Sequence, residues 1–149
     1  GLINYRTFQE GYQQYVDTHS SCWIFIIDVD KFKDVNDTFG HMAGNHVLKK
    51  MAMTLSNIVR SSDIVCRMGG DEFILLCSGF ETEEQAHTFA KRIKSAVVDA
   101  GKGERAWAGI SVGKASVSAA NKLESVIETA DADLYQDKKN NREALSQSI

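Results

Sequence analysis

Two aspartates follow the most hydrophobic stretch of the sequence. The run 22–27 contains apolar residues only; Asp28 comes directly after it, and Asp30 follows two positions later. A carboxylate beside such a run is costly unless it is paired, hydrogen-bonded or bound to a metal. Residues at alternate positions of an extended segment point to the same side, so both carboxylates could face one ligand. The alternative is a solvated strand end, because aspartate is common in turns.

A second acidic pair lies in the segment 67–73, Arg-Met-Gly-Gly-Asp-Glu-Phe. Two glycines let a backbone approach a ligand closely. The adjacent carboxylates of Asp71 and Glu72 concentrate negative charge, and magnesium binds through such oxygen ligands together with substrate phosphates. The alternative is an ordinary hairpin turn whose flanking charges stay in water.

The two acidic groups would form one site if the strand ending at Asp28 lay beside this hairpin. Asp28, Asp71 and Glu72 would then meet at one sheet edge, as in the two-metal sites of phosphoryl and nucleotidyl transfer. The sequence contains no Gly-x-x-x-x-Gly-Lys-Ser/Thr, which argues against a P-loop fold. Phosphates would instead rest on the amides of residues 30–33, at the start of a helical turn, with Lys33 adding positive charge.

Hydrophobic periodicity predicts the elements that must position these residues. Helices are expected over Asn4 to about Asp17, about Met42–Arg60, Thr82–Asp99 (with Thr82 and Gln85 as a capping box) and Lys122 to about Asn140. Strands are expected over Cys22–Ile27, Asp63–Met68, Glu72–Cys77 and Trp107–Val117. The connector Lys31–Gly40 is polar and is expected to hold only a short helical turn. The order αβαββαβα predicts helices packed on a central mixed sheet, and its two βαβ passes suit a ferredoxin-like palm.

Size and composition favour a single globular domain over residues 1–149. The net charge of −3 gives no basic surface for DNA or RNA. The three cysteines lie in apolar runs without framework spacing, so we expect buried free thiols in a reducing compartment. Without a signal peptide or a long apolar run, we expect a cytoplasmic domain with no membrane contact of its own. Because the sequence begins abruptly at Gly1, we expect it to come from a larger signalling protein.

The sequence resembles the GGDEF family of diguanylate cyclases from Gly1 to about Glu143. The resemblance rests on five ordered segments: Gly1–Arg6, Ile27–His41, Arg67–Phe73, Ile110–Gly113, and Ala130-Asp131-x-x-Leu134-Tyr135-x-x-Lys138. It implies an α+β palm with a mainly antiparallel sheet flanked by helices, related to the palms of nucleotide cyclases and polymerases. It also implies condensation of two GTP into cyclic di-GMP by two-metal catalysis at a homodimer interface.

By this resemblance, the acidic residues hold Mg²⁺ or Mn²⁺. Asp28 and the Val29 carbonyl would be metal ligands, Asp71 a metal ligand and the base for the ribose 3′-hydroxyl, and Glu72 a further ligand. The division of duties between Asp71 and Glu72 stays open. Lys33 would stabilise charge at the attacked α-phosphate.

The resemblance likewise implies the groups that bind the nucleotide. Lys138 and Arg142 would hold the outer phosphates, although the family's usual glycine and asparagine beside Arg142 are replaced by Asn141 and Glu143. The remaining substrate-binding candidates are Phe32, Asn36, His41, Asn45, Gly69 and Gly70.

Asn45 departs from the family pattern. The family has an aspartate in Gly-His-x-x-Gly-Asp that pairs with two guanine N–H groups, and here the segment ends in Asn45. A carboxylate accepts from both donors, whereas an amide presents one carbonyl and one donor group. Either Asn36 carries guanine recognition alone, or base selection is relaxed.

Arg60 and Asp63 resemble the family's Arg-x-x-Asp inhibitory site, where cyclic di-GMP binds as product. Alone, this short pattern is usually a surface pair. Two other functions stay open beside the cyclase: a degenerate module that senses GTP or cyclic di-GMP, and a different cyclase or polymerase palm. The intact Asp28, Lys33, Asp71 and Glu72 argue against degeneracy, whereas Asn45 argues mildly for it.

Overall fold

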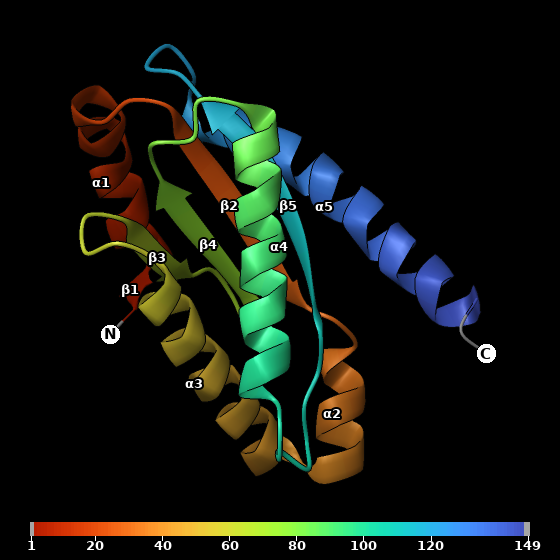
Figure 1. Ribbon diagram of the computed structural model, residues 1–149. Helices are drawn as coiled ribbons and strands as arrows, with labels where there is room; N and C mark the ends of the chain where they lie inside the picture. Colours follow the sequence, from red (N-terminus) through yellow and green to blue (C-terminus); the bar gives the residue numbers. More distant parts are fainter. Residues whose placement is uncertain (1, 148–149) are drawn as a thin grey trace.

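The computed structural model describes residues 2–147, which form a five-stranded sheet with helices on both faces (Figure 1). The strand order is β1-β3-β4-β2-β5, and every neighbouring pair is antiparallel except β1 and β3. The elements along the chain are β1 (Ile3–Asn4), α1 (Tyr5–Thr18), β2 (Cys22–Val29), α2 (Phe32–Phe39), α3 (His41–Ile58), β3 (Ile64–Arg67), β4 (Glu72–Cys77), α4 (Glu83–Ala100), β5 (Ile110–Val117) and α5 (Leu123–Gln147).

Strand β2 lies inside the sheet, between β4 and β5, and is covered on both faces. Phe25 and Ile27 point into a core formed with α2, α3 and α4, and Ile24 and Ile26 point into a second core formed with α1 and α5. The continuous apolar run predicted this double coverage, because each face of such a strand must be buried. Figure 1 shows the two helical layers on opposite sides of the sheet.

The connections confirm the predicted α+β, ferredoxin-like palm with a mainly antiparallel sheet. One crossover leads from β2 through α2 and α3 to β3, and the other leads from β4 through α4 to β5. In each case one strand separates the two that the crossover joins, so that β4 lies between β2 and β3, and β2 between β4 and β5. The hairpin β3–β4 joins the two halves.

The predicted helix starts at Asn4 and Thr82 are confirmed. The Asn4 side chain accepts a hydrogen bond from the Thr7 amide at 2.9 Å. Thr82 accepts from the Gln85 amide at 3.2 Å, and the Gln85 side chain accepts from the Thr82 amide at 3.3 Å. These bonds satisfy amides that have no partner within their own helices.

Two elements near the site differ from the prediction, because they contain few apolar residues that would indicate a helix or a strand. Residues 31–40, expected to hold a short turn, contain the two-turn helix α2, in which Val35 is the one buried residue. Strand β1 was not predicted, since it is only two residues long and forms by pairing with the distant β3.

Two boundaries were also misplaced. Strand β5 begins at Ile110 rather than Trp107, because Trp107 turns toward α4, where its indole N–H donates to the Val97 carbonyl at 3.0 Å. Helix α5 continues to Gln147 rather than ending near Asn140. The Asn141 side chain hydrogen-bonds to β5, and these bonds hold this polar part of α5 against the sheet.

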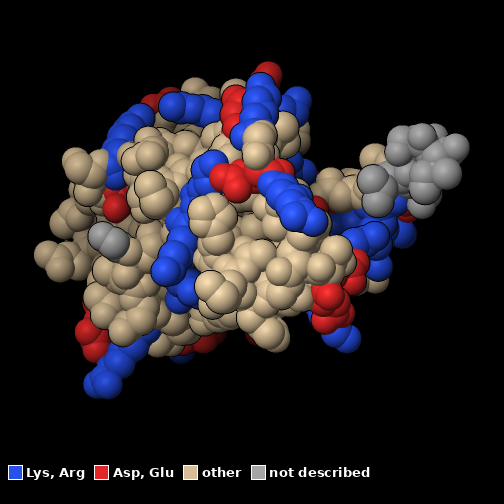
Figure 2. All heavy atoms as spheres, turned by 90° about the horizontal axis from the view of Figure 1, so that it is seen from below, with Lys and Arg blue, Asp and Glu red and all other residues tan. Residues whose placement is uncertain are grey.

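All three cysteines are buried and free, as expected. Within residues 2–147, no helix has the length and apolar character needed to cross a membrane. Figure 2 shows the end of the molecule where α2 and the start of α3 lie. In this view basic and acidic side chains are interspersed around uncharged surface.

Gly113 permits the close approach of α5 to β5, and we predict that Gly113→Ala destabilises the fold by about 1–3 kcal/mol. A methyl group there would overlap the Ala130 carbonyl oxygen and the Leu134 backbone nitrogen. Urea unfolding measures the change. Gly11→Ala in α1 is the control, since its nearest neighbour would be Ile64 Cδ1 at 3.9 Å. That variant should be stabilised by about 0.5–1 kcal/mol, and equal stabilities of the two variants would contradict the prediction.

Candidate active site

Strand pairing brings the two acidic groups of the sequence together. Asp28, near the end of β2, is the register partner of Glu72, the first residue of β4. The Val29 amide donates to the Asp71 carbonyl at 3.1 Å, which continues the contact into the hairpin. The condition that the sequence left open, that β2 lies beside the hairpin, is therefore met.

Burial and mutual repulsion make this group of carboxylates electrostatically strained. Burial raises the pKa of Asp71 and of Glu72, and the nearby charge of Asp28 raises both further. The Lys138 ammonium lies against the Asp28 carboxylate, whose side chain is only 15% exposed. The hydrogen bond between Lys138 and Asp28 raises the pKa of Lys138. One lysine thus balances a partly buried cluster of negative charge.

The donor atoms of this cluster suit a hard divalent cation. Among the described residues, no three Asp, Glu, His or Cys side chains converge closely enough to hold a metal ion alone. Magnesium, however, is bound by one or two carboxylates and completes its shell with water and substrate phosphates. Asp28, Asp71, Glu72 and the Val29 carbonyl supply only oxygen, so they fit Mg²⁺ or Mn²⁺ held jointly with a nucleotide.

The Gly-Gly hairpin leaves its backbone open to a ligand. The Met68 amide donates to the Glu72 carbonyl at 2.9 Å and closes the turn. Neither Gly69 nor Gly70 has a left-handed φ, and a Cβ on either would meet nothing within 4 Å. Neither backbone strain nor internal packing therefore requires these glycines.

Arg67 holds this hairpin, a role that the sequence analysis did not assign. Its guanidinium donates to the Gly70 carbonyl at 2.7 Å and to the Gly69 carbonyl at 3.2 Å. A basic residue two positions before a pair of glycines was the available signal, because such a side chain can reach the turn carbonyls.

The predicted base-binding residues gather where α2 meets α3. Asn36 and Phe32 lie directly against Gly44, where a Cβ would overlap the Asn36 amide oxygen. His41 and Asn45 are exposed at the start of α3, and their side chains make no hydrogen bond to another described residue. Lys33 is likewise exposed, at the start of α2.

A large cleft lies beside α2. It has a volume of about 1160 Å³ and is bounded by α2, the end of α4, the start of β5 and α5. Of the predicted residues, Val29, Lys138 and Arg142 line it. This cleft therefore includes the phosphate-binding candidates Lys138 and Arg142 but not the base-binding candidates, which lie where α2 meets α3.

The protein family described as "Diguanylate cyclase, GGDEF domain" matches residues 1–144, nearly the whole chain. The chain belongs to the GGDEF domain family. The diguanylate cyclase DosC of Escherichia coli K12 is 39% identical over 122 residues, which is 80% of this chain and 26% of DosC. The chain thus spans about a quarter of the length of that relative.

Solved structures agree with this assignment. The GGDEF domain of YfiN (TpbB) from Pseudomonas aeruginosa superposes with a TM-score of 0.80 at 26% identity, covering 94% of this chain and 92% of that one. A sensory box/GGDEF family protein from Caulobacter crescentus gives a TM-score of 0.81 at 28% identity, with coverages of 94% and 95%.

The inhibitory-site candidates of this GGDEF domain lie at the far end of β3 from the hairpin. The Asp63 carboxylate accepts from the Tyr15 hydroxyl at 3.0 Å and from the Arg60 amide at 2.9 Å. Burial raises the pKa of Tyr15, so its hydroxyl stays a donor. The Arg60 guanidinium is exposed and lies near Gly79. Asp63 is thus fixed by internal bonds, and Arg60 is accessible.

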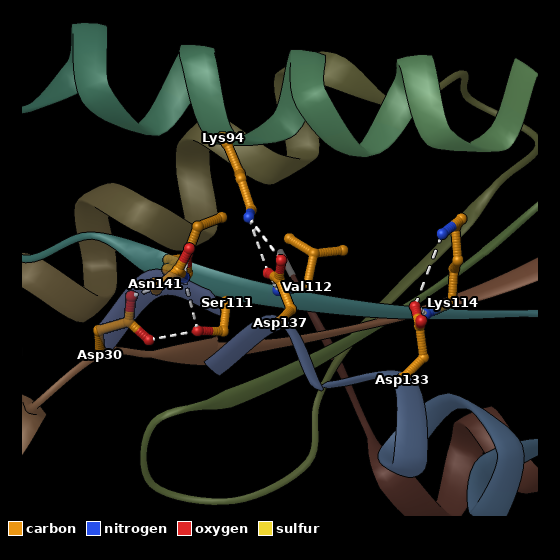
Figure 3. A network of polar contacts seen from close by, with 9 residues as sticks. Asp30, Lys94, Ser111, Val112, Lys114, Asp133, Asp137 and Asn141 are labelled. Carbon is orange, nitrogen blue, oxygen red and sulfur yellow. Dashed lines mark hydrogen bonds and ion pairs between the residues drawn. The ribbon is translucent and has the colours of Figure 1, made fainter. Parts of the chain in front are cut away.

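Asp30 belongs to a polar network that the sequence analysis missed. The hydroxyl of Ser111, a fully buried residue, donates to the Asp30 carboxylate at 2.5 Å and accepts from the side-chain amide of Asn141 at 2.9 Å (Figure 3). Asp30 does share the side of Asp28 that faces α5, as its spacing predicted, but its carboxylate is bonded to protein groups. The departure from the family pattern at Asn141 was the one available signal.

Proposed function

We propose that this GGDEF domain is a diguanylate cyclase that condenses two GTP into cyclic di-GMP and two pyrophosphates. The observation that carries the proposal is the cross-strand pairing of Asp28 with Glu72, directly beside the open Gly-Gly hairpin. Membership of the family and similarity to a relative named as a diguanylate cyclase support it.

The acidic cluster would bind the cation. Asp28, the Val29 carbonyl, Asp71 and Glu72 are the ligands for Mg²⁺ or Mn²⁺, which would act as a Lewis acid on the phosphoryl oxygens. The Asp71 carboxylate accepts the proton of the ribose 3′-hydroxyl.

The nucleotide would bind along α2. Lys33 stabilises the charge that develops on the α-phosphate, and Lys138 and Arg142 hold the outer phosphates from α5. Asn36 and Asn45 contact the edge of the guanine. The remaining contacts come from Phe32, His41 and the backbone of Gly69 and Gly70.

One domain holds one GTP, so turnover requires two domains that face each other. Each 3′-oxygen attacks the α-phosphorus of the partner's GTP. A new P–O bond forms, and the bond from that phosphorus to the bridging oxygen breaks and releases pyrophosphate. Two such steps close the ring, and a homodimer is therefore the active species.

A GTP or cyclic di-GMP sensor is the second candidate. Lys138 already neutralises Asp28, and the described residues contain no preformed three-residue metal cage. Asn45 also lacks the charge that the family pattern places at that position.

We predict that a dimer enforced by a fused coiled coil forms cyclic di-GMP from GTP and Mg²⁺, as detected by mass spectrometry. Glu72→Gln should lower the rate at least about a hundredfold, because it removes one cation ligand. The control is Glu128→Gln, at an exposed position of α5. Tight GTP binding without product would instead establish the sensor.

We predict that base selection is relaxed, so that ATP competes with GTP and mixed cyclic dinucleotides form. Asn45→Asp should raise the preference for GTP over ATP about tenfold, because a carboxylate accepts from both guanine donors. Asn57→Asp makes the same change at an exposed position of α3. Strict use of GTP by the wild type would contradict the prediction and leave guanine recognition to Asn36.

We further propose that Arg60 and Asp63 bind cyclic di-GMP and inhibit the enzyme. Arg60→Ala should weaken inhibition by about tenfold or more, because a charged hydrogen-bond donor is lost. The rate without product should stay unchanged. Arg92→Ala, at an exposed position of α4, is the control. An unchanged inhibition constant for Arg60→Ala would sink this proposal.

A further inference from the structure

Three side chains of α5 bond to the outer edge of β5. Asp133 accepts from the Lys114 amide at 2.9 Å, and Asp137 accepts from the Val112 amide at 2.7 Å. Asn141 donates to the Ile110 carbonyl at 3.3 Å and to Ser111 Oγ at 2.9 Å. We call Asp133, Asp137 and Asn141 the edge clamp; Figure 3 shows its members reaching the strand one after another.

The spacing of the edge clamp matches the strand. Its members are four residues apart, which is about 6 Å along a helix. They meet successive positions two residues apart on β5, which is about 6.6 Å along a strand. The helix and the strand run in opposite directions, so the register is kept over all three members. A shift of the helix by half a turn would break every one of these bonds.

Further contacts tie the edge clamp to neighbouring elements. Lys94 of α4 forms an ion pair with Asp137 at 2.7 Å, and Lys114 forms one with Asp133 at 3.6 Å. Asn141 connects through Ser111 to Asp30, which follows β2 (Figure 3). The position of α5 is thus linked to α4 and to the segment that begins α2.

Two residues proposed to bind phosphate follow members of the edge clamp directly. Lys138 comes after Asp137, and Arg142 comes after Asn141. Both line the large cleft, and Lys138 contacts Asp28. A movement of α5 by a fraction of a turn would carry both cations away from the acidic cluster.

We propose that the edge clamp positions Lys138 and Arg142 for the outer phosphates of the nucleotide, an inference that rests on the proposed function. The family pattern does not assign this role. Asp133 and Asp137 occupy positions that the pattern leaves open, and Asn141 is one of its departures. The three are positioning residues, because they act through Lys138 and Arg142.

The first arm of the test needs no ligand. Asp137→Ala should speed hydrogen exchange of the Val112 amide at least about tenfold, because that amide loses its partner. Asp137→Asn keeps an acceptor and should restore most of the protection, although it loses the charge that pairs with Lys94. Gln136→Ala, one residue away on α5 and exposed, is the control. If the Val112 amide exchanged as slowly in Asp137→Ala as in the wild type, the edge clamp would be refuted.

The second arm compares GTP with GMP, which lacks the outer phosphates. By titration calorimetry, Asp137→Ala and Asn141→Ala should weaken GTP binding about fivefold, as expected for loss of one charged contact. GMP binding should change less than about twofold. Loss of a negative charge at Asp137 would by itself favour an anionic ligand, so weaker GTP binding reflects displaced cations. Equal losses for GTP and GMP would overturn the positioning role.

The two arms separate this inference from the proposed function. If the wild type binds no GTP, the proposed function fails, and the positioning role fails with it. If Asp137→Ala nevertheless speeds exchange of the Val112 amide as predicted, the edge clamp is confirmed and the failure lies in the proposed function.

Discussion

The double burial of β2 is the constraint on which the rest of the structure depends. This strand pairs with β4 and β5 on its edges and has helices on both faces. A polar group at the end of this strand is therefore partly buried and needs a partner for its charge or its hydrogen bonds. Asp28 stands at that point, and its charge is balanced by Lys138 from the last helix. The same location that makes the carboxylate costly would make it a strong ligand for a cation.

The site is assembled from distant parts of the chain. Asp28 comes from the first long strand, Glu72 from the hairpin and Lys138 from α5. None of these contacts is local, so the cluster of charge exists only after the sheet has formed and α5 has docked. Loop-closure entropy opposes such contacts early in folding. Repulsion among the carboxylates therefore opposes the final stage of assembly and not the formation of the individual elements.

The sequence predicted the fold, and it predicted the meeting of Asp28 with Glu72 on the condition that the strand ending at Asp28 lies beside the hairpin. Both predictions depend on patterns with a physical cause. A continuous apolar run requires two covered faces, and the Gly-Gly segment locates the hairpin that sets the register. Polar elements were harder to predict. In helix α2 only Val35 is buried. Trp107 is an aromatic residue of the kind common in strands, but its side chain packs toward α4. The edge clamp consists of Asp and Asn on a helix, a pattern that normally marks a solvated face. Each of its members also bonds to a backbone group of β5, and no side-chain pattern reveals such a partner.

The edge clamp also has a consequence for assembly. A sheet edge with free amides invites another strand to add to it, which leads to domain swapping or aggregation. On β5, the Val112 and Lys114 amides are already bonded to carboxylates of α5. At the opposite edge, β1 is only two residues long and offers little to extend. In the proposed dimer, two copies of this domain would therefore meet through side-chain surfaces, which can separate again, and not by continuing one sheet from copy to copy.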